Sequence, residues 1–502
     1  MKAKTVQVNW HDKLAIFSVD FDPQCPSRFA TAGGDSNVRI WRLADAALAS
    51  VSVNFVSSLA RHTAAVNIVR FSPKESLLAS AGDDGTIIIW RQSKAADGNL
   101  DMISDEDSTE TWKAISLLRG SLADIYDLAW SSDGRFIISG SVDNTARIWD
   151  IKQAKCLHCI ADHSHYVQGV AWDTMGVFFA TQSSDRSVNM YEWQVRSANV
   201  TKKILLAKRS RAEYPPSGPT DSASKHDTLA KDPQVETSGA GKGMEPAVNA
   251  PSMTRLYHNE NLASFFRRPT FTPDGSLLLT PAGIQRPSTE PTQGGSTDAH
   301  QPPLANAVFV YARDQLTSPP VAVLSGFPKP AIAVRCAPRK FCLRSQTASG
   351  LPAPWLDLPY RMVIAVATQD AILLYDTQQP EPFAYLANFH YATLTDVAWS
   401  PDCRHLVMTS TDGYCSVVVF EPNELGSFYM KSAAALDDLA LSNAVPDTAK
   451  DLDVLHPPSK SVAAPPLVEP TKQAITTPKS LTTSDAKPTR KRIQPTFVGS
   501  LH

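Results

Sequence analysis

Serine, histidine and aspartate recur in this chain at a fixed spacing, and together they are the residue types of a hydrolytic triad. The clearest set is His62, Ser80 and Asp84, with Trp90 following. A spacing of 22 residues recurs in three pairs: His62 and Asp84, His163 and Asp185, and His390 and Asp412. A hydrolase needs one organised site, whereas repetition indicates buried networks whose members satisfy one another's hydrogen bonds. We therefore interpret His62, Ser80, Asp84 and Trp90 as a structural tetrad, and we expect no catalytic residue and no enzymatic activity.

Metal and cofactor chemistry find little support in the sequence. Cys156, Cys159 and His163 have the donor types of a zinc site, but no second ligand pair follows at zinc-finger spacing, which favours a thiol pair on a strand. The glycine-rich stretch Gly239–Gly243 has glycine where a phosphate loop needs Ser or Thr after its lysine. We expect no bound metal and no cofactor.

The elements that must position the tetrad also recur. Each repeat reads as an apolar strand, a turn, a small-residue strand, an Asp turn and a strand ending in an aromatic residue. Seven copies cover roughly residues 1–430, centred on Trp41, Trp90, Trp149, Tyr191, Tyr311, Tyr375 and Phe420. They resemble the WD-repeat family, which implies an all-β fold, a seven-bladed propeller of four-stranded blades.

The repeats differ in how much of the tetrad they keep. In blade two it is complete, and elsewhere we expect it to be partial. Ser121 stands where blade three should have histidine, and blade seven has Met408 and Val418 at the Ser/Thr and Trp positions. Blades five and six have no His or Asp in register. Thr5–Trp10 precedes the first repeat, and the family closes its ring by pairing such a strand with the last blade, which removes exposed sheet edges.

Composition divides the chain into a folded body and segments that we expect to be disordered. The propeller spans residues 1–430. Its expected inserts are disordered loops at 208–254 and 284–303 and an acidic loop at 97–110. Residues 431–489 are expected to be a disordered linker, and residues 490–498 a partner-binding peptide.

Charge and cysteine content exclude several classes of protein. The 48 Lys and Arg residues nearly balance the 50 Asp and Glu residues, which excludes a wholesale basic nucleic-acid binder. Met1–Asp22 lacks the apolar core of a signal peptide, and no apolar run approaches the roughly 20 residues that cross a bilayer. Seven cysteines give no disulfide framework. We expect a soluble, intracellular protein without membrane contact.

Two charged stretches keep alternative interpretations. Arg196–Arg211 has six basic residues and no acid, which fits a nuclear-import signal, a DNA-facing patch or simply a solvated strand and loop. Asp97–Glu110 has six acidic residues, which fits either a site for a basic partner such as histones or a solubilising loop.

The C-terminal peptide is the sharpest functional signal. The residues Arg490, Lys491 and Arg492 precede Ile493, Pro495 and Phe497, which would share one side of an extended chain. Such a peptide can add a strand to a partner's exposed sheet edge while its cations meet acidic residues. Taken alone, it also fits an import signal or an unstructured tail.

Two segments together carry a closer resemblance. Val6–Phe21 and the basic peptide at the far end resemble the WD-repeat, middle-subunit family of chromatin assembly factor one, fungal-type, and its sibling, the HIR-type histone chaperones. The resemblance implies a nuclear, non-catalytic scaffold that deposits histones three and four on newly replicated or repaired DNA. Its implied partners are the large and small subunits of the assembly complex and the histones, contacted directly or indirectly, with DNA reached only indirectly.

The same resemblance gives the C-terminal peptide a role. It matches the B-domain of both families, so Arg490, Lys491, Arg492, Ile493, Pro495 and Phe497 would bind the anti-silencing histone chaperone. The alternative is another WD-repeat interaction scaffold, such as a HIR-type subunit or a ubiquitin-ligase substrate adaptor, in which this peptide would have no role.

Overall fold

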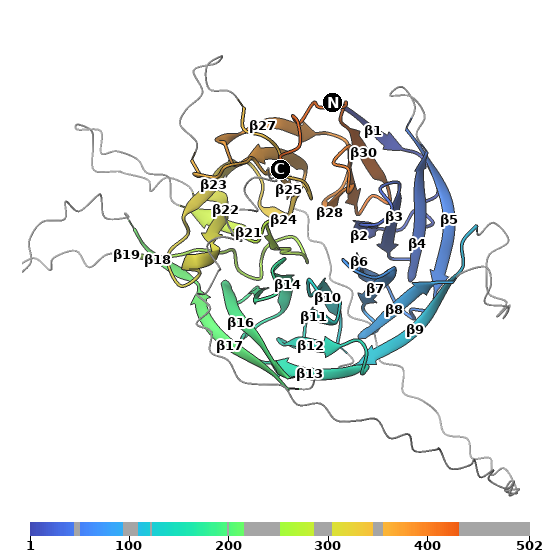
Figure 1. Cartoon of the computed structure of the whole chain (residues 1–502), viewed down its shortest axis with the longest axis horizontal. Coiled ribbons are helices and arrows are strands. Elements are labelled where there is room, and N and C mark those ends of the chain that lie inside the picture. Colours follow the sequence, from blue (N-terminus) through green and yellow to red (C-terminus); the bar gives the residue numbers. More distant parts are fainter. Residues whose placement is uncertain are drawn as a thin grey trace, which may run out of the picture. The chain divides into compact units, whose positions relative to one another are not determined.

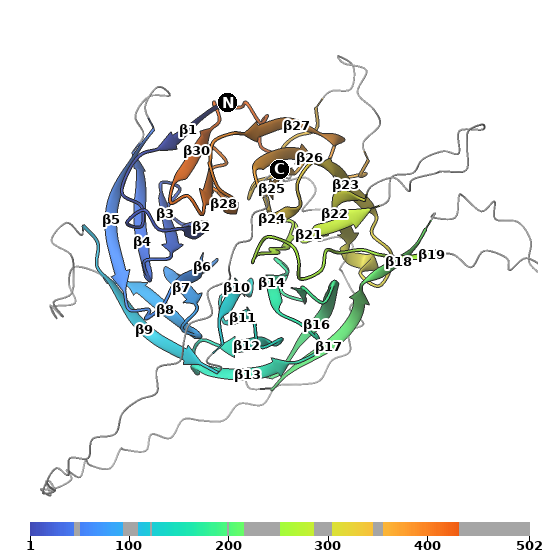
Figure 2. The same cartoon turned by 180° about the vertical axis from the view of Figure 1, so that it is seen from behind.

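Seven four-stranded antiparallel sheets form a ring of blades (Figures 1 and 2), which confirms the expected all-β, seven-bladed propeller. The computed structural model describes residues 1–44, 51–93, 109–120, 123–197, 200–214, 252–285, 304–344 and 355–430. Within these ranges the sole helix is a 3-10 turn, η1 (Arg313–Gln315), so none is long and apolar enough to cross a membrane.

The first four blades follow one another along the chain, each running from the ring axis outward. Blade one consists of β2 (Ile16–Phe21), β3 (Arg28–Gly33), β4 (Asn37–Ala44) and β5 (Ser52–Ala60). Blade two consists of β6 (Val66–Phe71), β7 (Leu77–Gly82), β8 (Thr86–Gln92) and β9 (Trp112–Arg119). Blade three consists of β10 (Ile125–Trp130), β11 (Phe136–Ser141), β12 (Ala146–Asp150) and β13 (Lys155–Ile160). Blade four consists of β14 (Val167–Trp172), β15 (Phe178–Ser183), β16 (Ser187–Ser197) and β17 (Val200–Arg209).

The remaining three blades complete the ring. Blade five consists of β20 (Thr270–Phe271), β21 (Leu277–Gln285), β22 (Ala305–Ala312) and β23 (Ala322–Phe327). Blade six consists of β24 (Ala331–Cys336), β25 (Val363–Thr368), β26 (Ala371–Asp376) and β27 (Gln379–Ala387). Blade seven consists of β28 (Leu394–Trp399), β29 (His405–Ser410), β30 (Cys415–Val419) and β1 (Lys2–Val6).

The N-terminal strand closes the ring by pairing with the last strand of the repeat region. Strand β1 runs antiparallel to β30, with Lys2 opposite Val419 and Val6 opposite Cys415. The closing strand therefore begins earlier than the expected stretch Thr5–Trp10, whose second half turns toward blade one. There Trp10 is buried, and its Nε1 donates a hydrogen bond to the Val6 carbonyl at 3.0 Å. Burial of Trp10 among side chains of blade one thus takes residues 7–10 away from the edge of β30.

The cores lie between blades. Each apolar cluster combines side chains from two consecutive blades, for example Val66 and Leu78 of blade two with Ile40 and Val56 of blade one. Because every inner strand has neighbours on both faces, β6 and β14 are buried along their whole length. Burial on both faces extends to the polar members of these strands, Asn67, Arg70 and Gln168, which are buried as well.

The expected inserts are shorter than composition predicted. Strand β17 runs to Arg209, and β18 (Arg211–Tyr214) pairs with β19 (Ser252–Arg255), so both ends of the expected loop 208–254 are strands. Strand β21 likewise takes in residues 284 and 285 of the loop expected at 284–303. Amino-acid composition is an average over a whole segment, whereas strand pairing depends on the few residues at each end of it. The predicted loop boundaries at 208, 254 and 284 were wrong for this reason.

The acidic loop at 97–110 and the tail fall mostly outside the described residues. Glu110 is described, and its carboxylate accepts hydrogen bonds from Arg28 at 2.9 Å and Arg42 at 2.6 Å, so this end of the loop is an ion-paired anchor and not a solvated one. The linker at 431–489 and the peptide at 490–498 lie outside the described residues.

Candidate functional site

Blade two brings the four residues of the sequence tetrad together. His62 lies in the loop before β6, Ser80 on β7, Asp84 in the next turn and Trp90 on β8. The His62 ring bonds Asp84 Oδ2 through Nδ1 at 2.9 Å and Ser80 Oγ through Nε2 at 2.7 Å. Trp90 Nε1 donates to the same Ser80 oxygen at 2.8 Å. The network ties the loop, the turn and two strands into one unit.

This geometry resembles a catalytic triad only in its residue types. Ser80 is fully buried, and its hydroxyl oxygen is already bonded to both rings, so no substrate carbonyl can approach it in this arrangement. Burial would raise the pKa of the Asp84 carboxyl, but the hydrogen bond and charge of His62 outweigh it and lower that pKa. A low pKa keeps the carboxylate ionised as an acceptor for the Thr63 and Thr86 amides.

Blade one also has a complete tetrad, which corrects the expectation that blade two alone is complete. His11 bonds Asp35 at 2.7 Å and Thr31 at 2.8 Å, and Trp41 Nε1 donates to Thr31 at 2.8 Å. The separation from His11 to Asp35 is 24 residues and not 22. A search for the 22-residue spacing between His and Asp therefore misses His11.

Three other blades keep parts of the network. In blade four His163 bonds Asp185 at 3.0 Å and Thr181 at 2.7 Å, while the Tyr191 hydroxyl donates to Asp162. In blade three Trp149 donates to Ser139 at 2.9 Å; Ser121 lies outside the described residues. In blade seven His390 bonds Asp412 at 3.0 Å, but within the described part of the chain its Nε2 has no partner, because Met408 occupies the hydroxyl position.

Blade five replaces the tetrad with tyrosines. The Tyr257 hydroxyl lies 2.9 Å from Thr280 Oγ1 and 2.9 Å from the Tyr311 hydroxyl. All three side chains are fully buried. Tyr257 thus takes the place of the histidine, and Tyr311 that of the tryptophan. Tyr257 precedes its blade by a long irregular segment, so no repeat spacing pointed to it.

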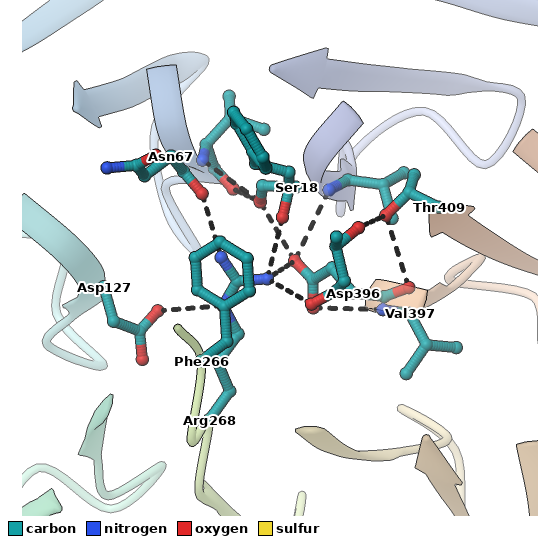
Figure 3. A network of polar contacts seen from close by, with 12 residues as sticks. Ser18, Asn67, Asp127, Phe266, Arg268, Asp396, Val397 and Thr409 are labelled. Carbon is teal, nitrogen blue, oxygen red and sulfur yellow. Dashed lines mark hydrogen bonds and ion pairs between the residues drawn. The ribbon is translucent and has the colours of Figure 1, made fainter. Parts of the chain in front are cut away.

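A second network fills the axis of the ring (Figure 3). Arg268, from the segment that leads into β20, reaches the axis with its guanidinium. It donates to the carbonyls of Phe17 at 3.0 Å, Asn67 at 2.9 Å and Thr395 at 2.9 Å, and pairs with Asp396 at 3.1 Å. A fully buried side chain from the segment before blade five thereby binds blades one, two and seven.

Opposite charges balance around Arg268. Asp396 also accepts a hydrogen bond from Arg70 at 2.9 Å, and Asp127 lies 3.6 Å from Arg268 Nε. Burial would raise the pKa of the Asp396 carboxyl, but Arg268, Arg70 and Arg335 outweigh it, and the net pKa is lowered. For Asp20 burial is the larger effect. It raises the pKa of the Asp20 carboxyl to about 6, although the positive charge of Arg70 lowers it.

The inner strands position this network through a shared irregularity. The β2–β3, β10–β11 and β28–β29 pairs each shift register just before the third residue of the inner strand. That third residue is Ser18, Asp127 or Asp396. A bulge re-aims the side chain that follows it. Sequence reasoning missed these residues, although their common position in the repeat was a usable signal.

Cavities lie beside the axial network and where blade seven meets blade one. One of about 260 Å³ adjoins the axial network and is lined by Asp20, Arg70, Asp127 and Arg335 together with Trp130 and Trp172. Two open cavities of about 880 and 530 Å³ flank Val8 and Asn9, where blade seven meets blade one. These hollows are concave positions at which a scaffold can receive side chains of other proteins.

The other predicted sites are placed as follows. Cys156 and Cys159 lie on β13, the outermost strand of blade three, and Cys159 is exposed. In the described ranges no group of three His, Cys, Asp or Glu side chains is arranged to hold a metal ion. The six predicted partner-binding residues, from Arg490 to Phe497, lie outside those ranges.

Comparison with known proteins points to one family. A model described as the CAF1B/HIR1 beta-propeller domain matches residues 1–217 and 242–425. The chain is 38% identical over 464 residues to the B subunit of chromatin assembly factor 1 from Mus musculus, covering 90% of this chain and 71% of the mouse protein. The protein of the same name in Schizosaccharomyces pombe is 37% identical over 464 residues, covering 85% and 89%. Protein hir1 of that yeast is 26% identical over 489 residues, covering 93% of this chain but 43% of its own length.

Proposed function

Because the chain belongs to the CAF1B/HIR1 β-propeller family, we propose that it is a non-catalytic scaffold subunit of a histone chaperone complex that assembles chromatin. The observation that carries the proposal is the similarity to proteins named as the B subunit of chromatin assembly factor 1 over 85–90% of the chain. The buried, mutually satisfied Ser, His and Asp side chains support a scaffold and not an enzyme. The complex would act in the nucleus, placing histones three and four on replicated or repaired DNA.

The ring supplies the rigid part of this function. Its blades are joined by interblade cores and by Arg268, which bonds the backbone of three blades at once. A body of this kind can present several surfaces in fixed relation, so the large and small subunits can bind it simultaneously. The cavities beside Val8 and Asn9 are the concave positions that we assign to such contacts.

The C-terminal peptide supplies the second part, the recruitment of the anti-silencing histone chaperone. Ile493, Pro495 and Phe497 would enter pockets beside an exposed sheet edge of that chaperone, while Arg490, Lys491 and Arg492 meet acidic residues around it. Residues 431–489 would act as a tether that raises the effective concentration of the captured chaperone and its histones near the ring.

The test is a calorimetric titration of the full chain with the anti-silencing chaperone. Truncation after Thr489, or replacement of Ile493 and Phe497 by alanine, is expected to weaken binding at least about a hundredfold, since two buried anchors are lost. Replacement of Ile475 and Leu481, two apolar residues of the linker, is the matched control and should leave the affinity unchanged. An unaltered affinity after truncation would show that the donor binds elsewhere.

The HIR-type subunit is the second candidate, since one family model describes both kinds of propeller. Identity favours the first, because the S. pombe hir1 relative is 26% identical and the chain covers 43% of it. Co-purification from nuclei followed by mass spectrometry separates them. The two other assembly-factor subunits should accompany the chain if the first proposal holds, and HIR-complex subunits if the second does.

A further inference from the structure

Four arginines gather where blade four leads into blade five. Arg186 lies in the turn between β15 and β16, Arg209 ends β17, Arg211 begins β18 and Arg255 ends β19. We call these four residues the arginine quartet. Two of its members belong to the basic stretch 196–211, which has no role in the function proposed above.

The backbone holds the quartet together. Arg211 stands directly opposite Arg255 in the β18–β19 pair. Next to them the Leu256 amide donates to the Ser210 carbonyl at 3.0 Å. Arg186 Nε donates to the Tyr257 carbonyl at 3.1 Å, and Arg209 is opposite Val188 on β16. Like charges directly opposite one another in an antiparallel pair destabilise it, so the Arg211–Arg255 pair has a cost that folding alone does not require.

The quartet has little negative charge to balance it. In the described part of the chain, none of the four guanidinium groups lies within 4.0 Å of a carboxylate. The pKa of Arg186 is lowered, first by burial and then by the charges of Arg255 and Arg211, against the single attraction of Glu260. Two nitrogens of Arg209, Nε and Nη2, are buried without a hydrogen-bond partner among the described residues. Because those two nitrogens are closed to solvent, an anion would meet the quartet through the exposed Arg211 and Arg255 and the half-buried Arg186.

The side chains around the quartet favour phosphate over an acidic peptide. Guanidinium groups bind phosphate through two parallel hydrogen bonds, and contacts to the DNA backbone need only such donors. A peptide strand would also need apolar surface to bury, but the adjoining Leu256 and Tyr257 are already buried. Lys208 on β17 is exposed but lies 3.6 Å from the Asp185 carboxylate, so its charge is already balanced and is not counted here.

From these observations we propose that the arginine quartet binds the phosphate backbone of duplex DNA. The contact goes beyond the proposed function, which reaches DNA only through partners, and it stands whether or not the C-terminal peptide recruits the histone donor. It would be independent of base sequence and strongly dependent on salt.

The test uses the full-length chain and a labelled 30-base-pair duplex, followed by fluorescence anisotropy between 50 and 200 mM KCl. Each phosphate contact contributes a slope of about −0.9 to a plot of log K against log salt concentration. The double variant Arg211→Gln/Arg255→Gln should bind at least about tenfold more weakly at 100 mM salt, with a slope shallower by about two. The matched control is Arg61→Gln/Arg119→Gln, which removes two other exposed arginines and should keep the wild-type slope.

A second variant excludes loss of folding as the cause. Arg211→Glu places a carboxylate opposite Arg255, so it should raise the melting temperature slightly while weakening DNA binding more than Arg211→Gln does. Both variants should still bind the histone donor with unchanged affinity. The proposal is overturned if the wild-type chain does not bind the duplex, or if the double variant keeps the wild-type slope. It is also overturned if the double variant loses binding to poly-glutamate while it still binds the duplex.

Discussion

At the scale of single residues, the chain uses the same polar side chains for two kinds of buried network. Within a blade, His62, Ser80, Asp84 and Trp90 satisfy one another over 28 residues of sequence. On the axis, Arg268 bonds residues up to 251 positions away. Each bond made in these networks avoids the penalty of leaving a buried donor or acceptor unpaired, which is about 1–3 kcal/mol for each neutral group and more for a charged one. At the axis Arg268 Nε and Asp127 Oδ1 are buried without a hydrogen bond and interact only as an ion pair at 3.6 Å.

Arg268 gives the first prediction at this scale. Arg268→Ala should lower the free energy of unfolding by about 3–5 kcal/mol, because it leaves Asp396 and Asp127 with less compensating charge and three carbonyls without a donor. Arg268→Lys should recover little of this, since the three donors of an ammonium group cannot serve three carbonyls and also Asp396 and Asp127. Urea unfolding of both variants measures the loss. Full recovery by lysine would mean that charge alone matters at the axis.

Asp20 gives a prediction on pH. Its pKa in the folded chain is raised from 3.8 to about 6 by burial, so the native state holds this proton more tightly than the unfolded chain. Its contribution to stability is therefore fully present below about pH 4 and is lost as the pH rises through 6. Asp20→Asn should remove this contribution.

Urea unfolding at pH 4.5 and 7.5 checks it. Relative to the variant, the wild type should lose about 1–2 kcal/mol more on going to the higher pH. Asp20→Asn is its own matched control at the two pH values, because the amide keeps the shape and cannot titrate. Equal pH dependence in the two proteins would contradict the assignment.

At the scale of elements, the segment before blade five is seated against an inner strand with no space for a side chain. A Cβ added to Gly169 of β14 would lie 1.7 Å from the Arg267 carbonyl oxygen. Gly169 is thus required by close approach of two backbones. The same contact explains why Arg267 and Arg268 are both fully buried without belonging to a strand.

Gly169→Ala should therefore destabilise the ring by about 3 kcal/mol or more, through displacement of the Arg267–Arg268 segment. Gly326→Ala is the matched control: φ is +91° and nothing lies within 4 Å of the added carbon, so only backbone strain of about 1 kcal/mol is expected. Thermal and urea unfolding distinguish the two. Equal losses of stability in the two variants would indicate that the Arg267–Arg268 segment can shift away from residue 169 without an energetic cost.

At the scale of the whole ring, closure depends on a strand from the opposite end of the repeat region. Strand β1 covers the edge of β30 through five consecutive residue pairs. Without β1, strand β30 would present unpaired backbone groups beside buried side chains. An exposed edge of this kind can pair with a strand of another chain. Closure thus removes an aggregation site as well as completing blade seven.

Deletion of residues 1–6 should lower the unfolding midpoint and cause self-association that increases with protein concentration. Light-scattering chromatography over a tenfold concentration range measures it. Substituting the exposed Lys2 and Lys4 with serine keeps the backbone pairing and should leave the chain monomeric to the same extent as the wild type. A monomeric deletion variant would mean that another segment covers the edge.

The sequence alone determined the all-β fold, the number of blades and the tetrad of blade two. These features repeat, and each blade is held by contacts between residues near one another in the chain, so spacing reveals them. The family resemblance inferred from Val6–Phe21 likewise agrees with the comparisons.

Only the tertiary structure decided the contacts made across the ring. Arg268 meets Phe17, Asn67 and Thr395, Tyr257 replaces a histidine, and Arg255 comes opposite Arg211, although none of these pairs has a fixed spacing. The closed ring decides which inner strands lie next to Arg268. The pairing of β18 with β19 decides that Arg211 and Arg255 meet. The local sequence pattern contains no information on the placement of the inner strands or on the path of the insert. Both depend on the geometry of all seven blades together.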